Sequence, residues 1–468
     1  MKSATQELVN FVSDTEFQDL PERVVYESKK VLLDALGCSL AGISVDKGKI
    51  SIAFAERLGG PPESTILGVG SRVSCAAAAF ANGELIQALD YDPILLPPGH
   101  VSPFVISAPL ALSESIGGSG KDLVLAIAIA HEVSTRLAMA LGAAHRYPEP
   151  GRRYVMQGYN MCVFGGVSAA GKVLKLNREK LSYAFGIAGY LCPVAARAKW
   201  TDTVPLSMTK HLPAGWISQA EVTAALLAEA GYIGDSTVLD GEYGFWRFSN
   251  SDMWNPDVLV EKLGKEWVFP LGVHYKRYPF CGIASISALD LFSKIIEENH
   301  LMPDDIEKVK VLVSPLSIDP IRSNRDIRSH VDAQFSIPYP FAVAAHRVRV
   351  GADWQDLDTI KNPKILEFMK KVEFDGHPGH ERALAEDPKD ALGLSVVEVE
   401  AKGRAFREET KIFKGKPRPR MKEEELVEKF RNNASRILTW GKVDKAVKSI
   451  LELEKVENVR NLMEDLAL

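Results

Sequence analysis

Apolar residues recur at helical spacing through the first 270 residues of the chain. After Leu20-Pro21 they fall at Val24, Val31, Leu32 and Leu36, which predicts a helix that begins near the proline. Further helical patterns occupy about 120–142, 161–175, 178–189 and 214–231, and all are rich in Ala and Gly. Small side chains let helix backbones approach closely. The pattern therefore predicts a compact all-α bundle.

The pattern changes near residue 270. Ile306–Ser314 alternates apolar and polar residues, as a half-buried strand does. Leu394–Ala401 and Arg404–Phe413 alternate in the same way, and Lys402-Gly403 between them predicts a hairpin. A helix is expected after Ile283, and Phe335–His346 is expected to lead from an extended segment into another helix. Residues 271–415 are therefore predicted to form a smaller α+β domain.

Helical patterning returns at the C-terminal end. A basic, proline-containing linker, Lys414–Met421, precedes residues 422–468, which are expected to pack back onto the first helices. The predicted fold is mainly α. It has a large all-α domain from residues 1–270 and 416–468, and the α+β domain 271–415 is inserted before the C-terminal helices.

Composition and charge exclude several classes of protein. The 468 residues are 46% hydrophobic and 25% charged, as in ordinary globular proteins, and the net charge of −5 does not favour nucleic acid binding. No signal peptide is recognised and no apolar run is long enough to cross a membrane, so a cytoplasmic protein is expected. The 5 cysteines form no CxxC pair, which argues against a disulfide framework and a zinc ribbon.

The loop Ala88–Pro103 carries the first candidate chemistry. Its prolines predict a rigid segment that is neither helix nor strand and that presents Asp90, Asp92 and His100. Loops held by helices often carry catalytic groups. The alternative is a connector whose aspartates cap helices and whose histidine is solvated.

Two basic segments extend this set. Lys210 and His211 precede a predicted helix, and Lys276 and Arg277 lie where the two predicted domains join. Each charge alone is more often solvated than catalytic. With Asp90 and His100, however, they would supply cations for carboxylates and groups that move protons.

Three other patterns are interpreted as structural. Gly117–Asp122 lacks the spacing of a phosphate loop and is expected to be a turn before a helix. His131-Glu132 lacks the second histidine of a zinc motif, so His131 is expected to be a core or interface histidine with satisfied hydrogen bonds. His377 and His380 are expected in a solvated loop.

Six segments in order resemble the MmgE/PrpD family, which includes dehydratases, decarboxylases and epimerases of carboxylic acids. The resemblance implies a helical domain completed by the C-terminal helices, a smaller α+β lid domain and usually a homodimer. It implies that the protein uses no metal and no organic cofactor. It also implies that the bound partner is a small carboxylic acid. The segments are Leu33–Gly42, Ala81–Asp92, Phe164–Leu174, Lys210–Trp216, Lys276–Pro279 and Asp332–Tyr339.

Aligned position by position, the resemblance assigns active-site roles to Asp90, His100, Lys210 and Lys276. Three positions depart from the family pattern, and each implies a less polar pocket. Ile94 replaces a threonine, and Met156 and Cys281 replace histidines.

The chemistry common to the family is proton transfer at the carbon next to a carboxylate. A partly desolvated lysine beside other cations has a lowered pKa, so Lys276 or Lys210 could be the base, and His100 the acid. Asp90 would orient His100 or a lysine.

Substrate contacts are predicted from three further residues. Arg277 or Arg153 would bind a substrate carboxylate, and Tyr154 could replace the missing imidazole as a second proton donor.

The predicted function is a cofactor-independent lyase of the dehydratase type. Its substrate would be a small or medium-sized hydroxy or polycarboxylic acid. Two alternatives remain open: an epimerase or isomerase that uses the same α-proton transfer, and an inactive family member that acts as a binding or scaffold protein. The replacements Ile94, Met156 and Cys281 are what favour the inactive alternative.

Overall fold

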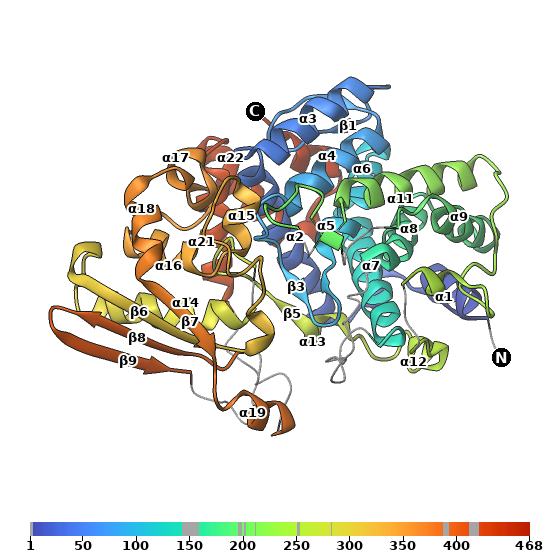
Figure 1. The fold of residues 1–468 in the computed structure, drawn as a ribbon. Helices are drawn as coiled ribbons and strands as arrows, with labels where there is room; N and C mark the ends of the chain where they lie inside the picture. The colour runs from blue at the N-terminus through green and yellow to red at the C-terminus, as the bar shows by residue number, and fades with distance from the viewer. Residues whose placement is uncertain are drawn as a thin grey trace.

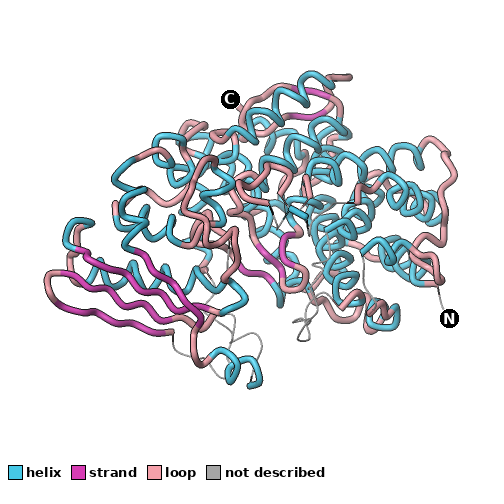
Figure 2. The backbone as a smooth tube through the Cα atoms, in the orientation of Figure 1, coloured by secondary structure: helices cyan, strands magenta, loops and turns pink. Residues whose placement is uncertain are grey.

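The computed structural model describes residues 3–142, 159–194, 199–200, 203–210, 212–249, 253–281, 283–386, 393–410 and 421–468. For residues 283–285 and 316 only the backbone is described. Within these residues helices dominate, and the strands gather in one four-stranded sheet and two smaller ones (Figures 1 and 2). The predicted fold class, mainly α with a smaller α+β region, is confirmed.

The large helical part packs long helices around one apolar core, whose buried residues lie between Ala4 and Tyr275 and between Leu426 and Leu466. At its centre α7 and α11 flank α8 (Figure 1). The helices are α1 Ala4–Asp14, α2 Glu22–Gly42, α3 Asp46–Leu58, α4 Cys75–Gln87, α5 Ser102–Val105, α6 Ser107–Ile116, α7 Gly120–Ala140, α8 Cys162–Val173, α9 Arg178–Leu191, α11 Ala214–Glu229, α12 Pro256–Val260 and α13 Phe269–Gly272.

Two glycines explain how closely α8 approaches its neighbours. A Cβ atom on Gly165 would lie 2.4 Å from the Ala130 carbonyl oxygen of α7. A Cβ atom on Gly166 would lie 1.8 Å from the Glu221 side chain of α11. Both approaches are closer than carbon contacts allow. Gly165 faces backbone and therefore requires glycine, whereas at Gly166 the end of the Glu221 side chain would have to move.

Helix α7 is long and apolar enough, by length and composition, to cross a membrane. However, 94% of its apolar window is buried inside the protein. Ser119 caps its first turn with Asp122, and the preceding Gly117 is left-handed with φ 68°, as expected for a turn before a helix. Helix α7 is therefore a core helix of the bundle.

The α+β part is built on a sheet with strand order β7-β6-β8-β9, seen at the lower left of Figures 1 and 2. Only β6 and β7 are parallel. The predicted β8–β9 hairpin is confirmed, and both its turn residues, Lys402 and Gly403, have positive φ. The elements are β6 Ile306–Val313, β7 Val372–Gly376, β8 Val396–Ala401, β9 Arg404–Glu409, α14 Ile283–Glu298, α15 His330–Phe335, α16 Pro338–Ala345, α17 Leu357–Ile360, α18 Pro363–Phe368 and α19 His380–Glu386.

A second apolar core, with buried residues from Tyr278 to Ala401, joins this sheet to α14 and α16. The last helices, α21 Glu423–Ala434, α22 Trp440–Leu451 and α23 Val459–Asp465, leave it and return to the first core. Phe430 of α21 packs on α2, where a Cβ on Gly37 would lie 3.1 Å from its ring. The chain thus leaves the helical part, builds the α+β part and comes back.

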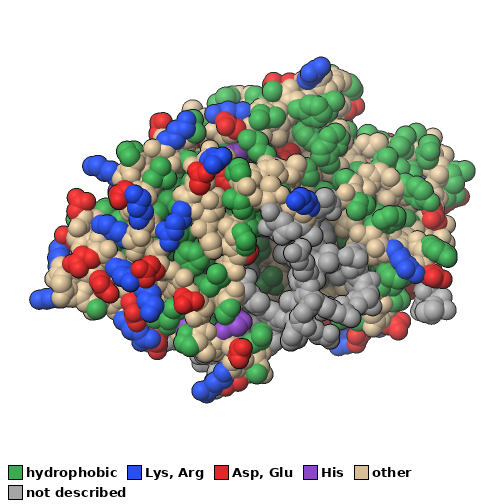
Figure 3. Space-filling view, in the orientation of Figure 1, with side chains coloured by type: hydrophobic (Ala, Val, Ile, Leu, Met, Phe, Trp, Pro, Cys, Tyr) green, Lys and Arg blue, Asp and Glu red, His purple; other side chains and the backbone are tan. Residues whose placement is uncertain are grey.

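The outer surface differs between the two parts. Figure 3 shows Lys, Arg, Asp and Glu interspersed over the α+β part, whereas hydrophobic side chains gather over the helices at the upper right. Exposed apolar residues of the helical part include Ile50, Phe54 and Leu58 of α3 and Trp216 of α11.

Candidate active site

A small three-stranded sheet places the loop at residues 90–100 beside the start of the α+β part. Its order is β4-β3-β5, with β3 Ile94–Leu95, β4 Gly99–His100 and β5 Val273–His274. Ile94 lies opposite both His100 and His274. The prediction that this loop contains no strand is wrong. The chain reverses at Leu96–Pro98, and β5, which pairs with β3, comes from a segment far away in the sequence.

Asp90 binds both predicted lysines. Its Oδ1 lies 2.6 Å from Lys210 Nζ, and its Oδ2 lies 2.7 Å from Lys276 Nζ. Lys276 Nζ also donates to the Asp90 backbone oxygen at 2.8 Å. Asp90 follows helix α4 in a left-handed conformation with φ 53°, which Asp tolerates better than most residues. All three side chains are buried, so each charge is held by its neighbours rather than by water.

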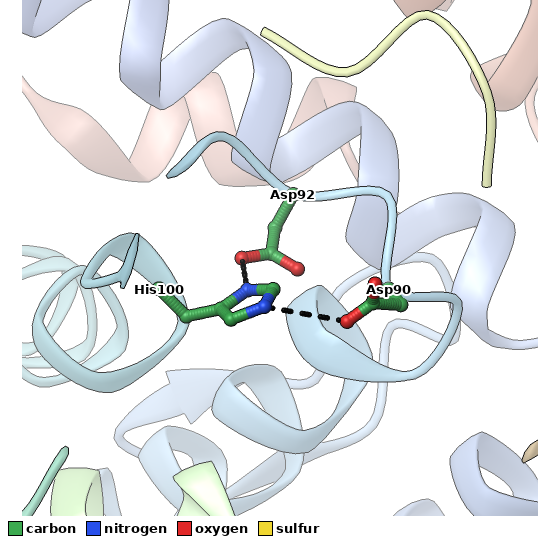
Figure 4. Close-up of side chains that lie close together, drawn as sticks. All are labelled: Asp90, Asp92 and His100. Atoms are coloured by element: carbon green, nitrogen blue, oxygen red, sulfur yellow. Dashed lines mark hydrogen bonds and ion pairs between the residues drawn. The ribbon is translucent and has the colours of Figure 1, made fainter. Parts of the chain in front are cut away.

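The His100 ring lies between two carboxylates, as Figure 4 shows. Its Nδ1 is 2.6 Å from Asp92 Oδ2, and its Nε2 is 3.3 Å from Asp90 Oδ1. A carboxylate on one ring nitrogen fixes the orientation of an imidazole and leaves the other nitrogen for chemistry. Here Asp92 makes the shorter contact, so Asp92 rather than Asp90 orients the ring.

The two lysines differ in their tendency to hold a proton. Burial lowers the pKa of Lys210, and the nearby ammonium groups of Lys47 and Lys276 add to that effect. Burial also acts to lower the pKa of Lys276, but the carboxylates of Asp90 and Asp92 outweigh it, so the pKa of Lys276 is raised. Lys210 therefore loses its proton more readily, while Lys276 stays charged.

Asp90, Asp92 and His100 have ligand atoms within 4.8 Å of one another, a spacing at which such groups can hold a metal ion. The donors here are two carboxylates and one imidazole, but both oxygens of Asp90 already bind ammonium groups at 2.6 and 2.7 Å. The lysines thus supply the positive charge that a cation would bring. We assign no metal to this cluster.

The other predicted residues are placed as follows. Ile94 is buried beside His100 in the small sheet. Cys281 is partly exposed and packs in an apolar cluster with Trp200 and Phe335, and Lys210 Nζ lies 6.0 Å from the Phe335 ring centre. Burial raises the pKa of the Cys281 thiol to about 11, and the Asp90 carboxylate adds to the shift. The thiol is therefore protonated at neutral pH.

Arg277 does not join the cluster. Its guanidinium is half exposed and pairs with Glu425 of α21 at 3.0 Å. That Arg277 binds a substrate carboxylate stays a prediction, since the described contact of its guanidinium is with Glu425. Arg153, Tyr154 and Met156 lie outside the described residues.

Two residues at the site were missed by the sequence interpretation. Asp92 was noted on the loop but given no role, although its spacing from Asp90 was a usable signal. No feature of the sequence pointed to Tyr159 as a residue of the site. Its ring meets His100 edge-on at 5.7 Å and stacks on Phe104 at 5.0 Å, and a Cβ on Gly99 would lie 2.7 Å from its hydroxyl. Tyr159 thus supports the His100 ring, and Gly99 leaves it room.

His131 is a structural histidine, as expected. It is buried, with Nδ1 2.8 Å from the Ile127 carbonyl oxygen and Nε2 2.9 Å from Ser102 Oγ. Burial lowers its pKa to about 4, so the ring is neutral.

Comparison with known proteins agrees with this architecture. The MmgE/PrpD N-terminal domain matches residues 6–255, and the MmgE/PrpD C-terminal domain matches residues 278–454. The cis-aconitate decarboxylase of Homo sapiens is 28% identical over 98% of this chain and 93% of its own length. The enzymes with that name from Mus musculus and Aspergillus terreus (strain NIH 2624 / FGSC A1156) are 25% and 24% identical, over 98% of this chain and 92% and 95% of theirs.

Proposed function

Because the chain belongs to the MmgE/PrpD family and is a lyase of that type, we propose that it removes a proton next to a carboxylate without a cofactor. The substrate would be a small or medium-sized hydroxy or polycarboxylic acid, and water would leave. The observation that carries this proposal is the buried contact of Lys210 and Lys276 with Asp90, with His100 3.3 Å from the same carboxylate.

In this proposal Lys210 is the base and Lys276 the permanent cation. A hydrogen next to a carboxylate is weakly acidic, so the negative charge that develops on the carboxylate oxygens must be stabilised as the proton leaves. The raised pKa of Lys276 keeps its ammonium charged for that purpose, and the lowered pKa of Lys210 favours the free amine that accepts the proton.

His100 is the proposed acid. Lys210 takes the proton from carbon, the C–O bond of the substrate hydroxyl breaks, and the electron pair of the former C–H bond forms the new double bond. His100, oriented by Asp92 at 2.6 Å, protonates the departing hydroxide so that it leaves as water. The proton on Lys210 then returns to the His100 imidazole through solvent, and the site is reset.

Decarboxylation is the second candidate, because the relatives reported above are cis-aconitate decarboxylases. The C–C bond to the departing CO2 breaks, the electron pair stays on the remaining carbon skeleton, and His100 protonates that carbon. Lys276 would stabilise the same kind of charge. The two reactions thus need the same cation and acid, and only dehydration needs the base.

A less polar substrate than a tricarboxylic acid is a further part of the proposal. Ile94 and Cys281 replace polar residues of the family pattern, and Cys281 packs in an apolar cluster with Trp200 and Phe335. Fewer polar partners would make a third carboxylate more costly to bury.

The test is to follow 13C-labelled cis-aconitate and a panel of hydroxy acids by NMR in D2O. A new alkene with release of water supports dehydration, and release of labelled CO2 supports decarboxylation. Deuterium that enters recovered substrate with inversion and no double bond would contradict a lyase and indicate an epimerase. Specific binding of these acids with no turnover of any of them would favour a binding or scaffold protein.

A second copy of the chain is the proposed partner, as the family resemblance suggests. The apolar residues exposed on α3 and α11 fit such a contact, since Ile50, Leu58 and Trp216 are 59%, 46% and 46% exposed. Phe54→Asp in this surface is expected to lower the mass measured by light scattering from dimer to monomer. An unchanged dimer would place the interface elsewhere.

A further inference from the structure

A lysine from the C-terminal helices reaches under the active-site loop. Lys429 of α21 places its Nζ 2.7 Å from Asp34 Oδ1 of α2, and the side chains are 4% and 0% exposed. Removing a charged pair from water is unfavourable, so an ion pair this deeply buried is weak evidence of a role in stability alone. The other contacts of Lys429 indicate a further role for the pair.

Lys429 also holds the residue between the two active-site carboxylates. Its Nζ donates to the Tyr91 backbone oxygen at 2.8 Å and lies 3.7 Å from the centre of the Tyr91 ring. Tyr91 is 3% exposed, so neither contact competes with bulk water. One ammonium group therefore fixes the carbonyl and the ring of the same residue.

The other end of Tyr91 reaches the second lysine segment. Its hydroxyl donates to the Arg277 backbone oxygen at 3.1 Å, one residue beyond Lys276. Asp90, immediately before Tyr91, is in the left-handed conformation with φ 53°, and Asp92 follows it. A rotation of the Tyr91 carbonyl would turn the backbone that directs both carboxylates.

We propose that Lys429 is a positioning residue for this site: by holding the Tyr91 carbonyl and ring, it keeps Asp90 on the two lysines and Asp92 on His100. The inference rests on the proposed function, since it explains how that site is kept assembled. It also assigns a role to the C-terminal helices, which supply this side chain 338 residues away from Tyr91 along the chain.

The charges of Asp34 and Lys429 also interact electrostatically with the active-site residues. Burial raises the pKa of Asp34 to about 6, while Lys429 opposes that shift, Asp92 adds to it and Lys276 opposes it. Above that pH Asp34 is ionised and compensates the charge of Lys429, which leaves the ammonium free to hold Tyr91.

The experiment compares Lys429→Met, Asp34→Asn and the double variant D34N/K429M with wild type. Each single variant leaves one buried partner without its counterpart, whereas the double variant is uncharged and removes only the hold on Tyr91. The matched control is Lys29→Met. Lys29 lies on α2, as Asp34 does. It binds Glu454 at 2.9 Å and the Leu451 carbonyl at 2.7 Å, and among the described residues it makes no contact with the active-site residues Asp90, Asp92 and His100.

Three readouts are needed: the melting temperature, kcat and KM on an accepted acid, and the 15N resonances of the His100 ring, assigned with a His100→Asn variant. We expect the melting temperature of the double variant to be closer to that of wild type than the melting temperature of Lys429→Met is. It should still show displaced His100 resonances and a kcat lowered about 100-fold, the scale expected for a small misplacement of catalytic groups. Lys29→Met should leave the resonances and kcat as in wild type.

The proposal would be overturned if the double variant had the melting temperature, the His100 resonances and the kcat of wild type. The pair of Asp34 and Lys429 would then be structural only. The NMR readout needs no substrate. If wild type turned over none of the acids, displaced His100 resonances would support the positioning role while the proposed function failed. Unchanged resonances in that case would overturn the positioning role too.

Discussion

Lys210 Nζ lies 2.6 Å from Asp90 Oδ1, and both side chains are almost completely buried. A lysine and an aspartate in such contact normally hold each other in the charged form, yet burial and two neighbouring ammonium groups lower the pKa of Lys210. The pair therefore combines a fixed geometry with an amine that gives up its proton more easily than an ordinary lysine. That combination suits a base that removes a weakly acidic proton from carbon.

The pH profile of turnover should reveal this base. Because the pKa of Lys210 is lowered, the free amine forms below the ordinary range of lysine, and kcat/KM should rise with pH through that lower value. Lys47→Met removes one of the ammonium groups that lower the pKa of Lys210, so the rising limb should move to higher pH. A limb that stays in place in Lys47→Met would argue against Lys210 as the base.

Asp92→Asn tests the orientation of His100. The amide keeps the size of the side chain but can present an N–H to Nδ1, which favours the wrong tautomer of the ring. In a comparable arrangement of histidine and aspartate this change lowers kcat by about 10⁴-fold, and we expect at least about 100-fold here. Asp375→Asn, in an exposed strand of the α+β part, is the control and should keep wild-type kcat.

Stability should fall as the pH is lowered from about 6.5 towards 4. His131 and His330 are buried, and burial lowers the pKa of each from 6.5 to about 4. Between these values the unfolded chain binds protons that the folded protein does not, so acid favours unfolding. Each histidine contributes up to about 3 kcal/mol of this loss.

The measurement is the free energy of unfolding in urea at pH 7 and at pH 4.5, for wild type and for His131→Asn. The variant should lose less stability between the two pH values than wild type does. An equal loss in both would mean that His131 does not remain neutral in the folded protein.

Gly165→Ala should destabilise the helical core. The new methyl group would lie 2.4 Å from the backbone carbonyl oxygen of Ala130, so α7 and α8 would have to separate, at a cost of about 1–3 kcal/mol. Gly441→Ala is the matched control in helix α22, because a Cβ there meets nothing within 4 Å. Alanine is the better helix former, so this control should melt at or above the wild-type temperature.

Much of the fold was predictable from local patterns. Ala-rich helical spacing marked α7, α8, α9 and α11, and strict alternation marked β6, β8 and β9, because in these segments the buried face follows directly from the sequence period. The strands β3, β4 and β5 were not predictable. They are 2 residues each, too short to show a period, and β3 pairs with β5 across about 180 residues of sequence.

The residues of the site were candidates from their loop and domain-junction positions, and the family resemblance assigned their active-site roles. Asp90, His100, Lys210 and Lys276 lie far apart in the sequence, and the structure brings them together around one carboxylate. The role of Asp92 and the direction of Arg277 depend on which way a side chain leaves the backbone, which residue order does not show.

The most direct test of the central claim is kcat/KM on an accepted carboxylic acid for Lys210→Ala and Lys276→Ala, with Lys29→Met as the control. The account predicts that each active-site variant folds and loses at least about 100-fold in kcat/KM, since each removes a group that acts on the reacting proton or on the charge that develops. The control should match wild type. Wild-type kcat/KM in both lysine variants would contradict the assignment of this cluster as the reaction centre.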